Sequence, residues 1–265
     1  MNTVSLDRLC ATLAYAVGIE KPVLANEKID DFAAYIDKTL DGGKADRIFM
    51  YNPEAIAHWV SDKYPDFIPE VKAHAPYALP LRTVMPSVTP VCFGTMYTGT
   101  QPDVHGIKKY EKPVIKVDSL FDAMLRAGKK CAIVCTDGDS LSRIYNERNM
   151  DYFYYRSIEE VNAKAAELIL SDEHDLIVVY NGDYDGTMHR WGPEHPLSLG
   201  ALRANARTFA EFAALIETHW QKHNTVLGFA MDHGCHEIDG GCGSHGLDMD
   251  EDMDILHFYK AIKGE

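Results

Sequence analysis

The sequence contains no long hydrophobic run. No stretch reaches the roughly 18 apolar residues that a transmembrane helix requires, so we expect no membrane span and no membrane partner. Residues 1–22 lack a basic start, since Asp7 and Arg8 precede a short apolar stretch, and we therefore do not expect a signal peptide.

Basic residues are also scarce. The chain has 26 Lys and Arg against 40 Asp and Glu, which gives a net charge of −14. A nucleic-acid polymer binds to a basic surface that releases its counterions, so this composition argues against such a partner. A small phosphorylated substrate remains compatible with the acidity, because a bound metal ion reverses the charge locally.

Cysteine is present, but without any C-x-x-C pair. A chain of 265 residues with 46% hydrophobic residues can bury a core without a disulfide framework. We therefore expect six reduced thiols and a cytoplasmic protein. A structural zinc site is the alternative near the C-terminus, although its spacings are unlike those of known zinc motifs; it would use Cys235, His236, Cys242 and His245.

Apolar segments alternate with helical patterns along the whole chain, without repeats or linkers. The expected strands are residues 47–51, 131–135, 175–180, 225–231 and 254–259. The expected helices include residues 3–17, 27–40, 120–127, 157–171 and a long helix within 196–223. This order predicts a mostly parallel sheet covered by helices on both faces, in a single domain over residues 1–265. Residues 1–45 would be a helical N-terminal extension that caps the sheet edge or pairs subunits.

Three polar clusters follow the expected strands. Asp185 and His189 are four residues apart and can meet on one face of a helical turn. Asp232 and His233 directly follow a strand, and His245 lies between glycines in a loop. Ligand-type residues at the carboxyl ends of parallel strands suit a metal site, whereas each cluster alone could be a solvated loop.

A fourth cluster surrounds Thr89. Thr89 followed by Pro90 is typical of a helix N-cap with proline at the first helical position. A hydroxyl there faces free backbone N–H groups and the positive end of the helix dipole, which suits a nucleophile or a bound phosphate. A plain capping role is the alternative.

Taken in order, these motifs resemble those of a known family. The segment PSVTPVCFGTMYTGTQPDVHGI (86–107) resembles the nucleophile segment of type I phosphodiesterases and nucleotide pyrophosphatases, in the alkaline phosphatase superfamily. The segments DYDGTMHRWGP (183–193), MDHG (231–234) and GSHGLDM (243–249) resemble their later motifs. The resemblance covers residues 46–262 and implies an alkaline phosphatase-like three-layer α/β/α sandwich.

The resemblance also implies an activity, which is hydrolysis of phosphate esters with two divalent metal ions. Thr89 would be the nucleophile. One ion would be held by Asp185, His189 and His245, and the other by Asp232 and His233 together with the residue at the end of the first strand. Family members usually use zinc, and manganese is the alternative.

Two positions depart from the family pattern. Asn52 stands where the family has a metal-binding Asp, so it would be an uncharged ligand unless Glu54 replaces it through an inward turn of the loop. Tyr110 stands near a family Asn that contacts phosphate, and we assign it to substrate binding. A phosphonate hydrolase or phosphomutase, distinguished by the pocket around Lys108 and Lys109, is one alternative. A catalytically impaired metabolite-binding protein is the other. The substrate and any homo-oligomeric state stay open.

Overall fold

The computed structural model describes residues 1–265 and contains a central seven-stranded sheet. The sheet order is β2-β9-β6-β1-β5-β3-β4. Its strands are β1 (Arg47–Pro53), β2 (Tyr77–Arg82), β3 (Cys131–Thr136), β4 (Asp151–Tyr155), β5 (Leu176–Asn181), β6 (Thr225–Phe229) and β9 (Asp254–Ile262). A separate hairpin joins β7 (His236–Ile238) and β8 (Cys242–Ser244).

The sheet is mostly parallel, as the sequence predicts. β1 lies parallel to both β5 and β6, and β3 lies parallel to β5 and β4. β9 runs antiparallel between β6 and β2. Every residue of β1 after Arg47 and every residue of β5 is buried, because helices cover both faces of these central strands.

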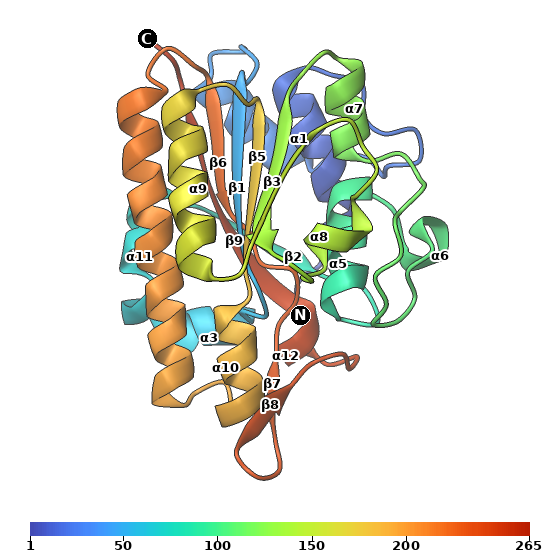
Figure 1. Ribbon diagram of the computed structural model, residues 1–265, viewed down its shortest axis with the longest axis vertical. Helices are drawn as coiled ribbons and strands as arrows, with labels where there is room; N and C mark the ends of the chain where they lie inside the picture. The colour runs from blue at the N-terminus through green and yellow to red at the C-terminus, as the bar shows by residue number, and fades with distance from the viewer.

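Helices form a layer on each side of the sheet (Figure 1). α9 (Ile158–Ser171) and α11 (Pro196–His219) pack together on one side, near α10 (Asp183–Trp191), α3 (His58–Lys63) and α4 (Pro69–His74). The other side holds α1 (Leu9–Val17), α5 (Thr89–Thr98), α6 (Pro102–His105), α7 (Leu120–Arg126) and α8 (Leu141–Ile144). The remaining elements are η1 (Leu6–Arg8), α2 (Asp30–Thr39), η2 (Pro65–Phe67) and α12 (Asp250–Met253). The expected three-layer α/β/α architecture is confirmed.

The first 45 residues belong to the helical layers of this sandwich. α1 packs against α2, α5 and α7, and α2 reaches β9. None of the helices combines the length and apolar character that crossing a membrane would require.

Besides the short hairpin strands β7 and β8, two strands of the central sheet were missed in the sequence, and both lie at the edges of that sheet. β2 contains Pro80 and exposes alternate residues, and β4 is aromatic without a clear apolar alternation. Edge strands are buried incompletely, so their sequences lack the continuous apolar run that reveals the central strands.

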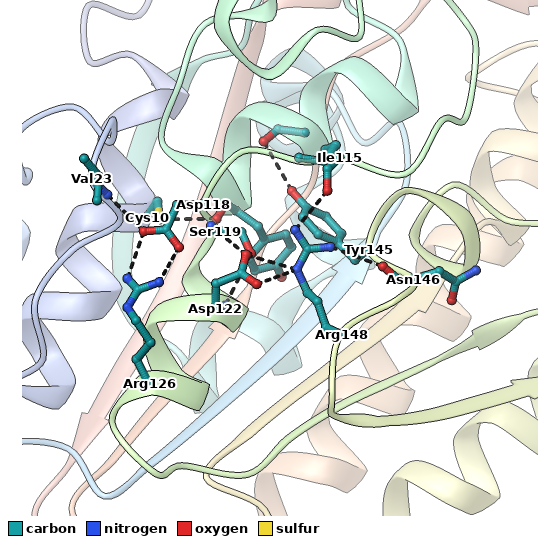
Figure 2. A network of polar contacts seen from close by, with 12 residues as sticks. Cys10, Val23, Ile115, Asp118, Ser119, Asp122, Arg126, Tyr145, Asn146 and Arg148 are labelled. Atoms are coloured by element: carbon teal, nitrogen blue, oxygen red, sulfur yellow. Dashed lines mark hydrogen bonds and ion pairs between the residues drawn. The ribbon is translucent and has the colours of Figure 1, made fainter.

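A polar network anchors the long segment between α6 and α7, residues 106–119, which contains no helix or strand (Figure 2). Arg148 donates to both carboxylate oxygens of Asp122, at 3.1 and 3.0 Å, and to the carbonyl of Ile115 at 3.1 Å. Asp118 is paired with Arg126 and accepts from the Val23 backbone N–H at 3.1 Å. The segment is therefore tied to α7 and to the N-terminal residues.

This network predicts a stability effect for Arg148, whose side chain is only 8% exposed. Arg148→Met should lower the free energy of unfolding by about 3 kcal/mol, because it removes the guanidinium that pairs with Asp122 and donates to the Ile115 carbonyl. Urea denaturation followed by circular dichroism measures this. The exposed pair Lys116–Glu147 provides the control, since Lys116→Gln should cost less than about 1 kcal/mol. Equal effects of the two substitutions would contradict this interpretation.

Candidate active site

Polar residues from three distant segments meet at the carboxyl ends of the parallel strands. Glu54 follows β1, Asp185 lies on α10 directly after β5, and Asp232 follows β6. These strands are neighbours in the sheet and end at the same edge, near α10 and the β7–β8 hairpin (Figure 1). Sheet topology thus creates the site.

The first cluster contains Asp185, His189 and His245, with one ligand-type atom of each within 4.8 Å of the others. Asp185 and His189 lie one turn apart on α10, with Asp185 Oδ1 and His189 Nε2 3.3 Å apart. His245 follows β8, and its Nε2 lies 3.5 Å from the same carboxylate oxygen. The structure therefore brings together the three residues that the first metal ion would need.

The second cluster contains Glu54, Asp232 and His233, all of them buried. His233 Nε2 lies 3.3 Å from Asp232 Oδ2. Ala55 adopts a left-handed backbone conformation with φ of 62°, which is unfavourable for a residue with a Cβ atom, and its N–H donates to Asp232 Oδ1 at 3.2 Å. This turn accompanies the inward position of Glu54.

Backbone carbonyls orient all three imidazole rings. In each ring Nδ1 lies at hydrogen-bond distance from a carbonyl oxygen, which only accepts, so Nδ1 carries the proton and Nε2 keeps its lone pair. The acceptors are Gly243 for His189 at 3.0 Å, Gly234 for His233 at 2.9 Å and Ser87 for His245 at 2.9 Å. The nitrogens suited to metal coordination therefore face the clusters.

Burial governs the pKa values of the site in the metal-free protein. Desolvation lowers the pKa of His233 to about 4 and that of His245 to about 3, which keeps both rings neutral near neutral pH. Contact with the Asp185 carboxylate raises the pKa of His189. Burial, reinforced by neighbouring carboxylates, raises the pKa of Glu54 and that of Asp232. The carboxylates thus lack the positive charge that would stabilise their ionised form.

The donor set fits divalent metal ions. Asp185 Oδ1 and Asp232 Oδ2 are buried oxygens without a hydrogen-bond partner, one in each cluster. His189 Nε2 and His245 Nε2 lie 3.1 Å apart, so their lone pairs repel unless a cation or a proton lies between them. Carboxylate oxygens with neutral imidazole nitrogens are ligands that zinc accepts, and manganese shares the oxygen preference.

Thr89 lies beside the second cluster. It is only 1% exposed, its hydroxyl donates to Glu54 Oε1, and its Oγ1 lies 3.4 Å from His233 Nε2. Thr89 is the first residue of α5, whereas Val88 is the N-cap, so the predicted N-cap position was one residue late. The hydroxyl contacts Glu54 instead of capping its own helix.

Asn52, predicted to be a metal ligand, has both ends of its side-chain amide engaged in hydrogen bonds within the chain. Its side chain is fully buried at the end of β1. Nδ2 donates to the Ala230 carbonyl at 2.6 Å, and Oδ1 accepts from the Tyr97 hydroxyl at 2.6 Å. The amide therefore joins β1 to the end of β6 and to α5, and Glu54 supplies the carboxylate of the second cluster.

The alternative zinc site of cysteine and histidine does not form. His236 Nδ1 pairs with Asp252 Oδ1 at 2.7 Å, and Cys235 is buried beside the Tyr184 hydroxyl. His245 belongs to the first cluster. All six cysteines are free thiols, as the sequence predicts.

A polar cavity of about 510 Å³ adjoins the clusters, since Glu54 and Asp185 are among its lining residues. Tyr110, predicted to bind substrate, also lines it. Lys108 and Lys109 do not; they pair with Asp103 and Glu111, respectively.

Instead, two basic residues that the sequence analysis missed, Lys112 and Arg156, line the cavity. Arg156 comes directly after the missed edge strand β4, so recognising that strand would have placed it among the strand-end residues.

The fold matches solved structures of nucleotide pyrophosphatases and phosphodiesterases. Human ectonucleotide pyrophosphatase/phosphodiesterase 5 superposes with a TM-score of 0.59 at 18% identity, over 73% of this chain and 58% of that chain. The murine protein 5 gives a TM-score of 0.59 at 16% identity, over 73% and 58% of the two chains. An inactive threonine-to-alanine variant of the murine protein in complex with AMP gives 0.60 at 16% identity, over 74% and 59%.

No protein-family model and no curated protein matches the sequence. The chain spans less than two thirds of the length of these solved proteins. The expected alkaline phosphatase-like α/β/α fold is thus confirmed: the chain shares the fold of these solved nucleotide pyrophosphatases and phosphodiesterases.

Proposed function

We propose that the protein is a metal-dependent hydrolase of small phosphate esters, of the phosphodiesterase and nucleotide pyrophosphatase type. The observation that supports this most strongly is the contact of the Thr89 hydroxyl with a buried ligand cluster, beside a second cluster of the same kind. The stacked rings of His233 and His245, with centroids 4.0 Å apart, join the two clusters into one site.

Thr89 is the proposed nucleophile. In the first step a bond forms between Thr89 Oγ1 and phosphorus, and the bond from phosphorus to the leaving oxygen breaks. The Thr89 hydroxyl, which donates a hydrogen bond to Glu54, releases its proton to solvent water, and the leaving oxygen takes a proton from water, so that the protons balance. In the second step water attacks the phosphothreonine, which releases phosphate or a phosphate monoester and restores the hydroxyl.

Two divalent ions, zinc or manganese, are the proposed cofactors. Asp185, His189 and His245 would hold one ion, and Glu54, Asp232 and His233 the other. When bound, these ions would supply Lewis acidity that lowers the pKa of the Thr89 hydroxyl and neutralises phosphoryl charge. The buried oxygens without hydrogen bonds support this assignment.

The site bears differently on the two alternative functions, an impaired binding protein and a phosphonate hydrolase or phosphomutase. The uncharged Asn52 would suit an impaired metabolite-binding protein, but Glu54 provides a carboxylate within the second cluster. A phosphonate hydrolase or phosphomutase would use the same ligands, so the cavity around Tyr110 must discriminate between these activities. The murine structure in complex with AMP is consistent with a small phosphorylated ligand.

Thr89→Ala should lower kcat for p-nitrophenyl phosphate or its diester by about a thousandfold or more, with metal content unchanged, because the attacking oxygen is removed. Thr89→Ser, which restores a hydroxyl, should recover part of the rate. The control is Thr218→Ala at the exposed end of α11, which should leave kcat unaltered. Turnover by Thr89→Ala at the wild-type rate would remove Thr89 from the mechanism.

Glu54→Gln should lower the metal content from about two ions per chain to about one, because it removes the charge of a buried ligand. Elemental analysis of protein dialysed against zinc measures this. Asn52→Asp should bind no additional metal and should destabilise the protein by about 1–3 kcal/mol, because a carboxylate cannot donate to the Ala230 carbonyl. The reverse pattern, with metal lost or gained only at Asn52, would assign the ligand role to Asn52.

A further inference from the structure

Two cations in the cavity have no acidic partner. Other basic side chains in the surrounding loops are paired, as in Lys108–Asp103, Lys116–Glu147 and Arg143–Asp137. Lys112 and Arg156 form no ion pair with any carboxylate, although both line the cavity beside the two clusters. In a chain with a net charge of −14, unpaired cations gathered at one cavity indicate a binding role.

The side chain of Lys112 and the backbone of Arg156 are held by defined contacts. Lys112 Nζ donates to the Gly138 carbonyl at 2.8 Å, and its segment is anchored three residues later by the Arg148 hydrogen bond to Ile115 (Figure 2). Arg156 lies between β4 and α9, and its backbone N–H donates to Glu160 Oε2 at 3.1 Å. Its guanidinium group makes no hydrogen bond within the chain and remains available to a ligand.

The carboxylates of the same cavity have other roles. Glu54 and Asp185 belong to the two clusters. Asp139 Oδ2 accepts from the Thr136 N–H at 3.2 Å. Asp183 and Glu159 lie in the first turns of α10 and α9, where the helix dipole favours a negative charge. None of these five groups neutralises Lys112 or Arg156 by direct pairing.

We propose that the substrate carries a second anionic group, which Lys112 and Arg156 bind while the reacting phosphoryl group lies at the two clusters. This inference rests on the proposed function. A cavity of about 510 Å³ has room for both groups on one small molecule. The second group is a carboxylate or another phosphate, since a guanidinium fork binds either in a bidentate manner.

Three esters built on the same ring test this inference. Phenyl phosphate has no second anionic group, 4-carboxyphenyl phosphate has a carboxylate, and 1,4-phenylene bisphosphate has a second phosphate. Calorimetry on zinc-loaded Thr89→Ala protein measures their affinities without turnover. At least one of the two esters with a second anionic group should bind about tenfold more tightly than phenyl phosphate. The tighter of the two identifies the group as carboxylate or phosphate.

Matched variants in the Thr89→Ala background show which residues cause the difference in affinity between the esters. Arg156→Gln and Lys112→Gln should each reduce the affinity gap. Arg207→Gln on α11 and Lys222→Gln beyond it, both exposed and unpaired, should preserve the gap. The inference would be overturned if all three esters bound equally, if neither ester with a second anionic group bound, or if the affinity gap survived both cavity substitutions.

Failure of the proposed function gives a different result. In that case the zinc-loaded wild-type protein would hydrolyse none of the three esters, whatever their affinities. Hydrolysis of phenyl phosphate without any preference in binding would instead support the proposed function and refute the second anionic group.

Discussion

The buried negative charge at the carboxyl end of the sheet is the constraint on which the rest of the site depends. Glu54 and Asp232 are both buried, and Asp185 contributes to raising the pKa of each. Carboxylates held together away from water are unstable as anions unless a cation compensates them. The three imidazole rings are turned so that their unprotonated nitrogens face the same space, which adds to the carboxylates the nitrogen donors that fit a metal ion.

The parallel strands bring these charged residues together. β1, β5 and β6 end side by side, so residues more than a hundred positions apart in the chain become neighbours. The fully buried α5 brings Thr89 to the same edge, and the amide of Asn52 fastens β1 to α5 and to the end of β6. Asn52 therefore holds β1, α5 and the end of β6 together, whereas Glu54 lies in the site itself, next to the left-handed turn at Ala55.

The sequence was sufficient for the central architecture because fully buried strands have continuous apolar runs. Residues 175–180 and 225–231 were recognised in this way, and the polar residues that follow them do lie at one edge. The edge strands β2 and β4 could not be predicted from the sequence. Because Arg156 directly follows β4, its place at the end of a strand could not be predicted either. The sequence also does not tell whether Asn52 or Glu54 joins the second cluster. That depends on the backbone conformation of Ala55 and on hydrogen-bond partners far away in the chain.

The measurement that tests the two-cluster site most directly is anomalous X-ray diffraction from crystals grown with zinc. The account predicts two anomalous peaks, one bound by Asp185, His189 and His245 and the other by Glu54, Asp232 and His233. Asn52 should keep its hydrogen bonds to Ala230 and Tyr97. A single peak, or an ion coordinated by the Asn52 amide in place of Glu54, would contradict the account.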